Sequence, residues 1–280
     1  MMHKMCALAM ALLVLIGCSD ANKDSSRAST ASSNVSVLPF EFMLDGLDRQ
    51  RTIRLYLPPD YANSTQSYPV LYMHDGQNVF DDATSYAGEW GVDESLNQLA
   101  ANSSLRLIVV AIDNGGDYRM KEMSPWENKR FGEAQGQQYM DFIVDVVKPY
   151  IDNNYRTEAD VKHTAIMGSS MGGLISHYAI HAYPHVFSKA GIFSPSYWYS
   201  TQVFDYSKLH KADLKAKLYV MYGDKEGDGM IADTDRMQRQ LTVQGHPQAN
   251  MLFKRVVGAE HNEKLWRSEF TEAIQWLFAD

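Results

Sequence analysis

The stretch TAIMGSSMGGLISHYAIHA, residues 164–182, joins an apolar β-type run to a helical run through a glycine-rich turn. The turn carries the pattern Gly-x-Ser-x-Gly centred on Ser170, which is typical of a nucleophile held between a strand and a helix. Flanking glycines let neighbouring backbone approach while Ser170 takes a strained conformation. The N-terminus of the following helix then faces negative charge that develops during a reaction. The stretch therefore predicts a strand–turn–helix unit with Ser170 as its nucleophile, rather than an ordinary tight turn.

Two later turns offer partners for such a serine, because the acid and then the histidine follow the nucleophile at later strand ends. The apolar run Lys217–Tyr222 leads into an acidic loop, and the run Met251–Val257 leads into the loop of His261. The acidic loop holds three carboxylates, Asp224, Glu226 and Asp228. We expect His261 to be the general base, since it is the only histidine in a loop directly after a late strand. The residues alone leave the acid open among the three.

Short β-branched or aromatic runs alternate with helical patterns along the chain, which predicts a doubly wound α/β sandwich. Runs that are apolar on both faces, such as residues 107–112, are typical of a parallel central sheet. The first two strands follow each other directly, so the sheet is expected to begin with an antiparallel edge. The expected strands are Val35–Leu44, Thr52–Leu57, Pro69–His74, Leu105–Ile112, His163–Met167, Lys189–Phe193, Lys217–Tyr222 and Met251–Val257. The expected helices are Val92–Ala101, Gln135–Asn153, Met171–Ala182, Ile231–Val243 and Glu263–Phe278.

The composition is that of a globular chain, with 280 residues of which 45% are hydrophobic and 21% charged. There are 34 acidic and 26 basic side chains, which give a formal charge of −8. No run of Lys and Arg exceeds two residues, so a nucleic-acid partner is not expected.

The N-terminus indicates export. An uncharged run from Cys6 to Gly17 is too short to span a membrane but suits the apolar region of a signal peptide. Its end, Leu15-Ile16-Gly17-Cys18, resembles a bacterial lipobox, which implies cleavage before Cys18 and lipid on its thiol. An ordinary signal peptide or a buried helix are the alternatives. We expect a signal peptide over 1–17, the lipidated Cys18 and a flexible tether over 18–34, and a single domain over 35–280. In the sorting pattern of such lipoproteins, a serine after the lipidated cysteine, here Ser19, directs the protein to the outer membrane. We therefore expect a periplasmic domain that is anchored by lipid to that membrane.

Four motifs resemble the esterase branch of the α/β-hydrolases, which includes enterochelin esterases, feruloyl esterases, S-formylglutathione hydrolase and the mycolyltransferases. They are His74–Asn78, Gly168–Gly173, Ser194–Trp198 and Gly258–Asn262. The resemblance covers nearly all of residues 35–280 and implies an α/β-hydrolase fold with a mostly parallel sheet and helices on both faces. It implies Glu226 as the acid, and the backbone amides of Gln77 and Met171 as the oxyanion hole. We expect the side chains of His74 and Asp75 to hydrogen-bond each other and shape their loop.

Aromatic residues gather in loops at the carboxyl edge of the expected sheet, where ligands bind in such folds. Five candidates for stacking on an acyl group or a sugar are Trp90, Tyr118, Trp126, Tyr197 and Trp198, with loop anchoring as the alternative. The acidic loop nearly matches a calcium-binding loop, but two ligand positions carry the wrong carboxylate length and a strand precedes it. His177 and His181 lie four apart on a helix without the glutamate of a zinc motif, which favours packing.

Together these features predict a lipid-anchored serine carboxylic-ester hydrolase of the cell envelope, with the triad Ser170, Glu226 and His261. No metal or organic cofactor is implied. The expected partners are a small-molecule or sugar ester and the membrane, with siderophore esters and feruloyl or acetyl sugar esters as substrate classes. Two alternatives remain, an acyltransferase of the mycolyltransferase type and a catalytically idle binding protein on the same scaffold.

Overall fold

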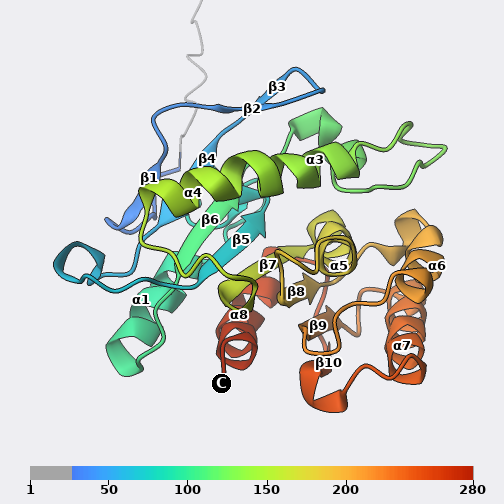
Figure 1. Cartoon of the computed structure of the whole chain (residues 1–280). Coiled ribbons are helices and arrows are strands. Elements are labelled where there is room, and N and C mark those ends of the chain that lie inside the picture. The colour runs from blue at the N-terminus through green and yellow to red at the C-terminus, as the bar shows by residue number, and fades with distance from the viewer. Residues whose placement is uncertain (1–26, 280) are drawn as a thin grey trace, which may run out of the picture.

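A computed structural model describes residues 27–279, and it contains an eight-stranded mixed sheet in the order β1-β4-β6-β5-β7-β8-β9-β10 (Figure 1). β1 and β4 pair antiparallel at one edge, β4 pairs antiparallel with β6, and the strands from β6 to β10 are parallel. The strands of this sheet are β1 (Val35–Val37), β4 (Ile53–Tyr56), β5 (Val70–His74), β6 (Ile108–Ile112), β7 (Thr164–Ser169), β8 (Lys189–Phe193), β9 (Lys217–Gly223) and β10 (Met251–Val256). The expected mixed sheet with an antiparallel edge is confirmed.

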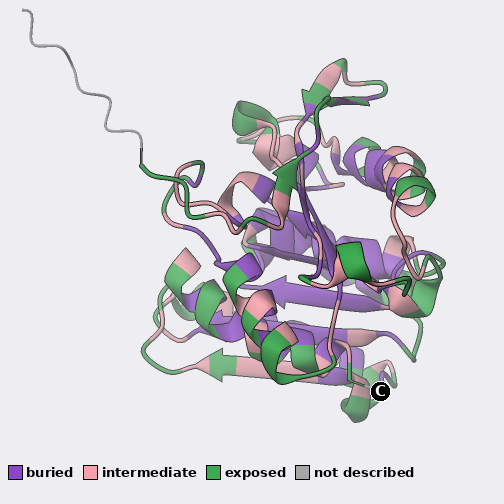
Figure 2. Cartoon of the chain, turned by 90° about the vertical axis from the view of Figure 1, so that its left-hand side faces the viewer, coloured by how far each residue is buried: buried purple, intermediate pink, exposed green. Residues whose placement is uncertain are grey.

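Helices cover both faces of this sheet because successive strand residues point to opposite sides. Along β5, Val70 and Tyr72 enter one buried cluster, and Leu71 and Met73 enter the other. The helices are α1 (Val92–Asn102), α2 (Arg119–Glu122), α3 (Gly136–Phe142), α4 (Lys148–Asn154), α5 (Met171–Ala182), α6 (Gln202–Leu209), α7 (Asp228–Val243) and α8 (Glu263–Leu277). α1 and α8 share one cluster, and α3 to α7 share the other. Figure 2 shows the central strands buried between these layers.

The expected strand Val35–Leu44 is wrong as one element. It divides into β1 and β2 (Phe42–Leu44), and β2 pairs with β3 (Arg49–Arg51) in a separate two-stranded sheet. Pro39 lies between the two strands and has no N–H to donate to a ladder, which is a physical reason for the break.

The expected helix Gln135–Asn153 is present as α3, one π-helical turn over Ile143–Val147, and α4. Pro149 stands at the start of α4 and cannot donate the bond that a regular α-helix requires four residues back. The wider turn before it accommodates that missing donor.

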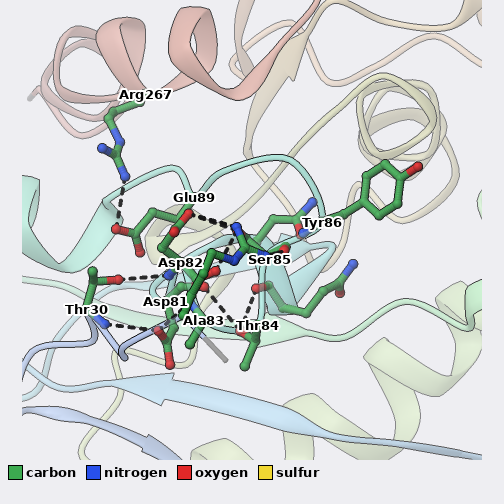
Figure 3. Close-up of polar contacts among 12 residues, drawn as sticks. Thr30, Asp81, Asp82, Ala83, Thr84, Ser85, Tyr86, Glu89 and Arg267 are labelled. Atoms are coloured by element: carbon green, nitrogen blue, oxygen red, sulfur yellow. Dashed lines mark hydrogen bonds and ion pairs between the residues drawn. The ribbon is translucent and has the colours of Figure 1, made fainter. Parts of the chain in front are cut away.

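Residues 27–34, the described part of the expected tether, lie against the loop that follows β5 and so differ from a free tether (Figure 3). Thr30 donates its N–H to Asp81 (3.0 Å) and accepts the N–H of Asp82 (2.8 Å). The Ser32 N–H donates to Asp93 (2.7 Å), and Arg27 pairs with Asp82 (3.2 Å). Polarity alone predicts a tether here, but these acidic side chains supply hydrogen-bond acceptors. Cys18 and the expected signal peptide lie outside the described residues.

Within residues 27–279, no helix has the length and apolar character needed to cross a membrane. Over the same range, no group of three His, Cys, Asp or Glu side chains is arranged to hold a metal ion.

The contact at the start of α3 gives a test of the fold. A Cβ on Gly136 would lie 2.3 Å from the Ser124 carbonyl carbon and 2.5 Å from Pro125 N, both backbone atoms. We expect Gly136→Ala to lower the free energy of unfolding by about 1–3 kcal/mol, because α3 must move away from its neighbour. Urea denaturation measures this change. The control is Gly229→Ala on α7, where a Cβ meets nothing within 4 Å; equal midpoints for the two variants would contradict the prediction.

Candidate active site

The turn between β7 and α5 holds Ser170 in a strained conformation, with φ +58° and ψ −117°. The Ser170 N–H donates to the Phe193 carbonyl (2.9 Å), and its own carbonyl accepts the Ser196 N–H (3.0 Å). A Cβ on Gly168 would lie 2.9 Å from the Gly172 backbone, and one on Gly173 would lie 2.7 Å from Phe193 O. Only glycines fit this crowded turn, so the sequence expectation of a strained serine between strand and helix agrees with the geometry.

His261 and Glu226 are joined by a hydrogen bond of 2.6 Å between Nδ1 and Oε2. A carboxylate can only accept, so Nδ1 carries the proton and Nε2 is left as an acceptor. The other carboxylate oxygen of Glu226 accepts the Gly223 N–H (2.6 Å) and the Ser194 hydroxyl (2.7 Å). The Glu226 side chain is 1% exposed. Its position is therefore fixed by three donors from three parts of the chain.

The other two carboxylates of the acidic loop have different neighbours. Asp224 accepts the Gly258 N–H (2.7 Å), which ties the loop after β9 to the loop after β10. Asp228 is exposed in the first turn of α7, a place that favours negative charge. Of the three, Glu226 is the one bonded to the His261 ring in the described chain.

Behind Glu226 lies a hydrogen-bonded chain that sequence reasoning missed. The indole Nε1 of Trp266 donates to Ser194 Oγ (2.9 Å), which in turn donates to Glu226. The Trp266 ring also meets the His261 ring edge to face, with centroids 5.2 Å apart. Ser194 has a positive φ of 45°, an uncommon conformation for a residue other than glycine. The Ser194–Trp198 motif was the one available signal, and it gave no reason to pair Ser194 with Glu226.

A cavity of about 430 Å³ brings Ser170 and His261 together at the carboxyl edge of the sheet. In it, Ser170 Oγ lies 3.1 Å from Ser196 Oγ, and the described chain has no hydrogen bond between Ser170 and His261. Catalytic hydrogen bonds are often long without substrate, so the shared cavity is the informative observation. The cavity is lined by Asp75, Gln77, Asn78, Tyr86, Asn114, Gly116, Arg119, Ser169, Ser170, His261, Glu263 and Trp266.

Of the two expected oxyanion donors, Met171 follows Ser170 in the chain and Gln77 shares the cavity with it. Met171 is the first residue of α5, where N–H groups have no partner within the helix. Gln77 lies in the short 3₁₀ turn after β5 and lines the cavity. Its carbonyl accepts the Thr84 hydroxyl (2.8 Å), and its side-chain oxygen accepts the Asn114 N–H (3.1 Å). These bonds hold the Gln77 loop at the cavity wall.

Asp75 does not bond His74, contrary to the expectation for this loop. It accepts two bonds from Arg119 (2.6 and 2.8 Å) and one from Asn114 (2.6 Å). Burial alone would raise the pKa of Asp75, but Arg119 and Asn114 outweigh it and hold this pKa below its ordinary value. His74 bonds the Tyr139 hydroxyl instead (2.8 Å), and burial lowers its pKa to about 4. At neutral pH the cavity wall therefore carries the Asp75–Arg119 ion pair, and the buried His74 ring behind it is neutral.

Three of the five expected stacking residues are buried, which corrects their assignment. Trp90 stacks on Phe193 (centroids 5.1 Å apart), Trp126 packs edge to face on Tyr178, and Tyr197 is 1% exposed. Aromatic side chains in these loops anchor them to the core.

The two exposed candidates, Tyr118 and Trp198, do not line the cavity either. The Arg49 guanidinium covers the ring of Tyr118 at 3.5 Å. Tyr86 is 91% exposed and lines the cavity, and sequence reasoning missed it.

His177 and His181 are buried between α5 and its neighbours, in agreement with the expected packing role. His177 bonds Ser207 (2.9 Å) and Tyr197 (3.0 Å), and His181 Nδ1 donates to the His210 carbonyl (2.6 Å). Burial lowers the pKa of His181 from 6.5 to about 4.

Comparison with known proteins gives one family. Residues 45–277 match the family described as "Putative esterase". A protein of Bacillus subtilis described as "Uncharacterized protein YbbA" is 28% identical over 81% of this chain and 92% of its own. The "Endo-1,4-beta-xylanase/feruloyl esterase" of Xylanibacter ruminicola is 23% identical over 85% of this chain and 30% of its own.

Solved structures share the fold at low sequence identity. The BES protein of Bacillus cereus has a TM-score of 0.75 at 16% identity, over 91% of this chain and 99% of its own. The enterobactin esterase of Shigella flexneri, solved in the presence of enterobactin, has a TM-score of 0.71 at 16% identity. It covers 91% of this chain, which spans 61% of that protein.

The buried histidines predict acid sensitivity with a definite sign. Below pH 6.5 the unfolded chain protonates His181 while the folded protein keeps it neutral down to about pH 4, so stability falls as the pH falls through this window. We expect His181→Gln, which keeps a donor to His210, to remove about 3 kcal/mol of the stability loss between pH 6.5 and 4.

The measurement is the free energy of unfolding in urea at pH 6.5 and at pH 4. The control is His185→Gln, because His185 is exposed on the loop that follows α5. Equal pH dependence in the two variants would show that the buried ring is not responsible.

Proposed function

The chain belongs to the esterase family that its residues 45–277 match, and we propose that it is a serine carboxylic-ester hydrolase with the triad Ser170, Glu226 and His261. The observation that carries this proposal is the 2.6 Å bond from His261 to a buried Glu226, at a cavity that also exposes the strained Ser170. The histidine is oriented by an acid, and its free nitrogen and the serine hydroxyl share one solvent-open space.

In the proposed reaction, Ser170 Oγ turns from Ser196 and attacks the ester carbonyl, while His261 Nε2 takes the hydroxyl proton. Glu226 stabilises the imidazolium through its bond to Nδ1. The carbonyl oxygen becomes an oxyanion bound by the Gln77 and Met171 amides, a contribution of about 3 kcal/mol per donor. The tetrahedral intermediate collapses, and His261 returns the proton to the leaving alcohol. Water then cleaves the acyl-enzyme by the same route, which releases the acid and restores Ser170.

We place the substrate among feruloyl, acetyl-sugar or siderophore esters. Support comes from the similar proteins whose names include feruloyl esterase and enterobactin esterase, and from a cavity wall rich in amide and charged groups. Such a wall suits an ester that carries hydroxyl or phenol groups.

We further propose that the enzyme acts in the cell envelope, held to a membrane by lipid on Cys18. This rests on the uncharged run before Cys18 and on the lipobox-like ending. Globomycin, which blocks lipoprotein signal cleavage, provides the test. A chain that shifts in mass with the drug and partitions into detergent supports the anchor, and a Cys18→Ser chain that partitions identically contradicts it.

The central experiment assays residues 18–280 with short-chain p-nitrophenyl esters, beside a Ser170→Ala control. We expect turnover that falls about 10³-fold or more in the control, because only substrate binding and the oxyanion hole then contribute to the residual rate. A fluorophosphonate probe should label the parent protein on Ser170 and leave the control unlabelled. A folded protein that neither turns over nor reacts with the probe would reject the hydrolase. Labelling without turnover, and transfer to an added alcohol, would indicate an acyltransferase.

Charge-neutral replacements test which carboxylate orients His261. We expect Glu226→Gln to lower kcat about 10²–10⁴-fold, because an amide does not stabilise the imidazolium and favours the wrong tautomer. Asp228→Asn is the matched control and should stay within about twofold, since Asp228 is exposed in α7. Steady-state kinetics at fixed pH measures both. A large loss in Asp224→Asn with near-normal Glu226→Gln would move the acid to Asp224.

Ser194 is expected to act as a positioning residue for Glu226. In Ser194→Ala the carboxylate loses one of its three donors and the Trp266 indole loses its acceptor. Since a hydrogen bond to a charged group contributes about 1.5–3 kcal/mol, we expect kcat to fall about tenfold or more, with little change in KM.

Trp266→Phe provides the comparison, because it keeps the ring beside His261 and leaves the Ser194–Glu226 bond in place. Its effect on kcat should be smaller than that of Ser194→Ala. Equal effects, or a change confined to KM, would show that Ser194 does not act through Glu226.

A further inference from the structure

A second cavity, of about 690 Å³, lies at the edge of the sheet opposite to Ser170. Lys189 begins β8 and Lys217 begins β9, and both line it, whereas Ser170 follows the end of the parallel strand β7. Its walls are mainly apolar and come from segments far apart in the sequence. The apolar wall residues are Pro69, Leu105, Val161, Pro184, Phe187, Ala216, Phe278 and Ala279. The volume is in the range of small-molecule sites in proteins.

Lys189 places an amine in this apolar cavity, and the residue is only 9% exposed. Its Nζ donates to the Lys162 carbonyl and lies 3.4 Å from Ser188 Oγ and 5.6 Å from the centre of the Phe278 ring. Within residues 27–279, no carboxylate lies in ion-pair distance of this amine. A buried ammonium without a counter-charge is unfavourable, so this site is incomplete without an anion.

The other charges around the cavity also favour an anion. Lys162, Lys215 and Lys217 join Lys189 in the lining, against the carboxylates of Glu158 and Asp213. Lys217 Nζ already donates to the Trp276 carbonyl (3.3 Å) and to the Ala279 carbonyl, and the two carboxylates also have hydrogen-bond or ion-pair partners. Asp213 accepts the Lys215 N–H (2.8 Å), and Glu158 lies 3.5 Å from His163 Nε2.

Electrostatics agrees with this geometry. Burial, with the nearby Lys217 and Lys162 charges, lowers the pKa of Lys189 from 10.5 to about 8, and the more distant Asp160 carboxylate opposes this shift only in part. An anion that binds beside the amine would restore the charged form.

We propose that this cavity binds an amphiphilic monocarboxylate, whose carboxylate pairs with Lys189 and whose apolar body packs against Leu105, Phe187 and Phe278. Lys189 supplies the positive charge, and the apolar walls favour a ligand with an apolar body over a small, fully hydrated anion such as free phosphate. The site is separate from the Ser170 cavity and does not depend on the ester chemistry proposed there. Alkyl and aryl acids share the required chemistry, and the experiment distinguishes them.

Titration calorimetry with octanoate and with benzoate tests the site on the folded chain. Octanamide is the control ligand, because it keeps the alkyl chain of octanoate but has no negative charge. We expect one octanoate or benzoate per chain, and at least tenfold weaker binding in Lys189→Met. Stronger binding of octanoate would identify an alkyl acid, and stronger binding of benzoate an aryl acid. Octanamide should bind weakly and equally to both proteins. Lys162→Met, which removes an exposed lysine of the rim, should change the affinity less than threefold.

Two further measurements separate this site from Ser170 and from misfolding. The bound acid should leave the KM for a p-nitrophenyl ester unchanged, because it occupies the opposite edge. Lys189→Met should keep the hydrolytic rate and should not lower Tm, since it removes an unpaired buried charge. No heat with either acid at millimolar concentration, equal binding in Lys189→Met, or competition with the ester substrate would each overturn the proposal.

Discussion

The backbone contact at Gly168, Gly172 and Gly173 constrains the whole carboxyl edge of the sheet. Any Cβ at Gly168 or Gly173 would lie within 3 Å of main-chain atoms, so β7, α5 and the end of β8 approach more closely than other residues allow. That approach places Ser170 in its strained conformation and bonds it to Phe193 and Ser196. Strain at one residue persists because the neighbouring strands and helix fix it from several sides. The position of Ser170 is thus set by backbone packing and does not depend on its own side chain.

A second constraint brings three chain segments to one carboxylate. Glu226 accepts hydrogens from the end of β9, from Ser194 after β8 and from His261 after β10. Trp266 of α8 completes this network through Ser194. A nearly fully buried carboxylate is stable only when its acceptors are satisfied, and here the same bonds that meet this requirement also orient the histidine. At this edge, the hydrogen bonds that stabilise the folded chain are therefore the same ones that orient the His261 ring.

The sequence predicted the site best where local backbone geometry restricts the residue types that fit. Glycine spacing around Ser170 and the order of later strand ends predicted the elbow and the loop of His261, because both follow from local geometry. The Ser194–Glu226 and Trp266–Ser194 bonds span 32 and 72 residues, and nothing local marks them. The stacking role expected for the aromatic loop residues was wrong for the same reason. Trp90 and Tyr197 are of the residue types that are common in binding surfaces, but their tertiary contacts bury them. Likewise, the polar residues 27–34 look free until Asp81, Asp82 and Asp93 are placed beside them.

The two edges of the parallel sheet differ in whether their buried charged side chains have partners of opposite charge. At the carboxyl edge, Asp75 is paired with Arg119, and Glu226 with His261, so each buried carboxylate has its partner within the chain. At the opposite edge, Lys189 is 9% exposed, and no carboxylate among the described residues forms an ion pair with it. Because an unpaired buried charge is unfavourable, selection for stability alone would favour an apolar residue at that position. A lysine there, facing a cavity with apolar walls, is accounted for when the missing negative charge arrives with a ligand.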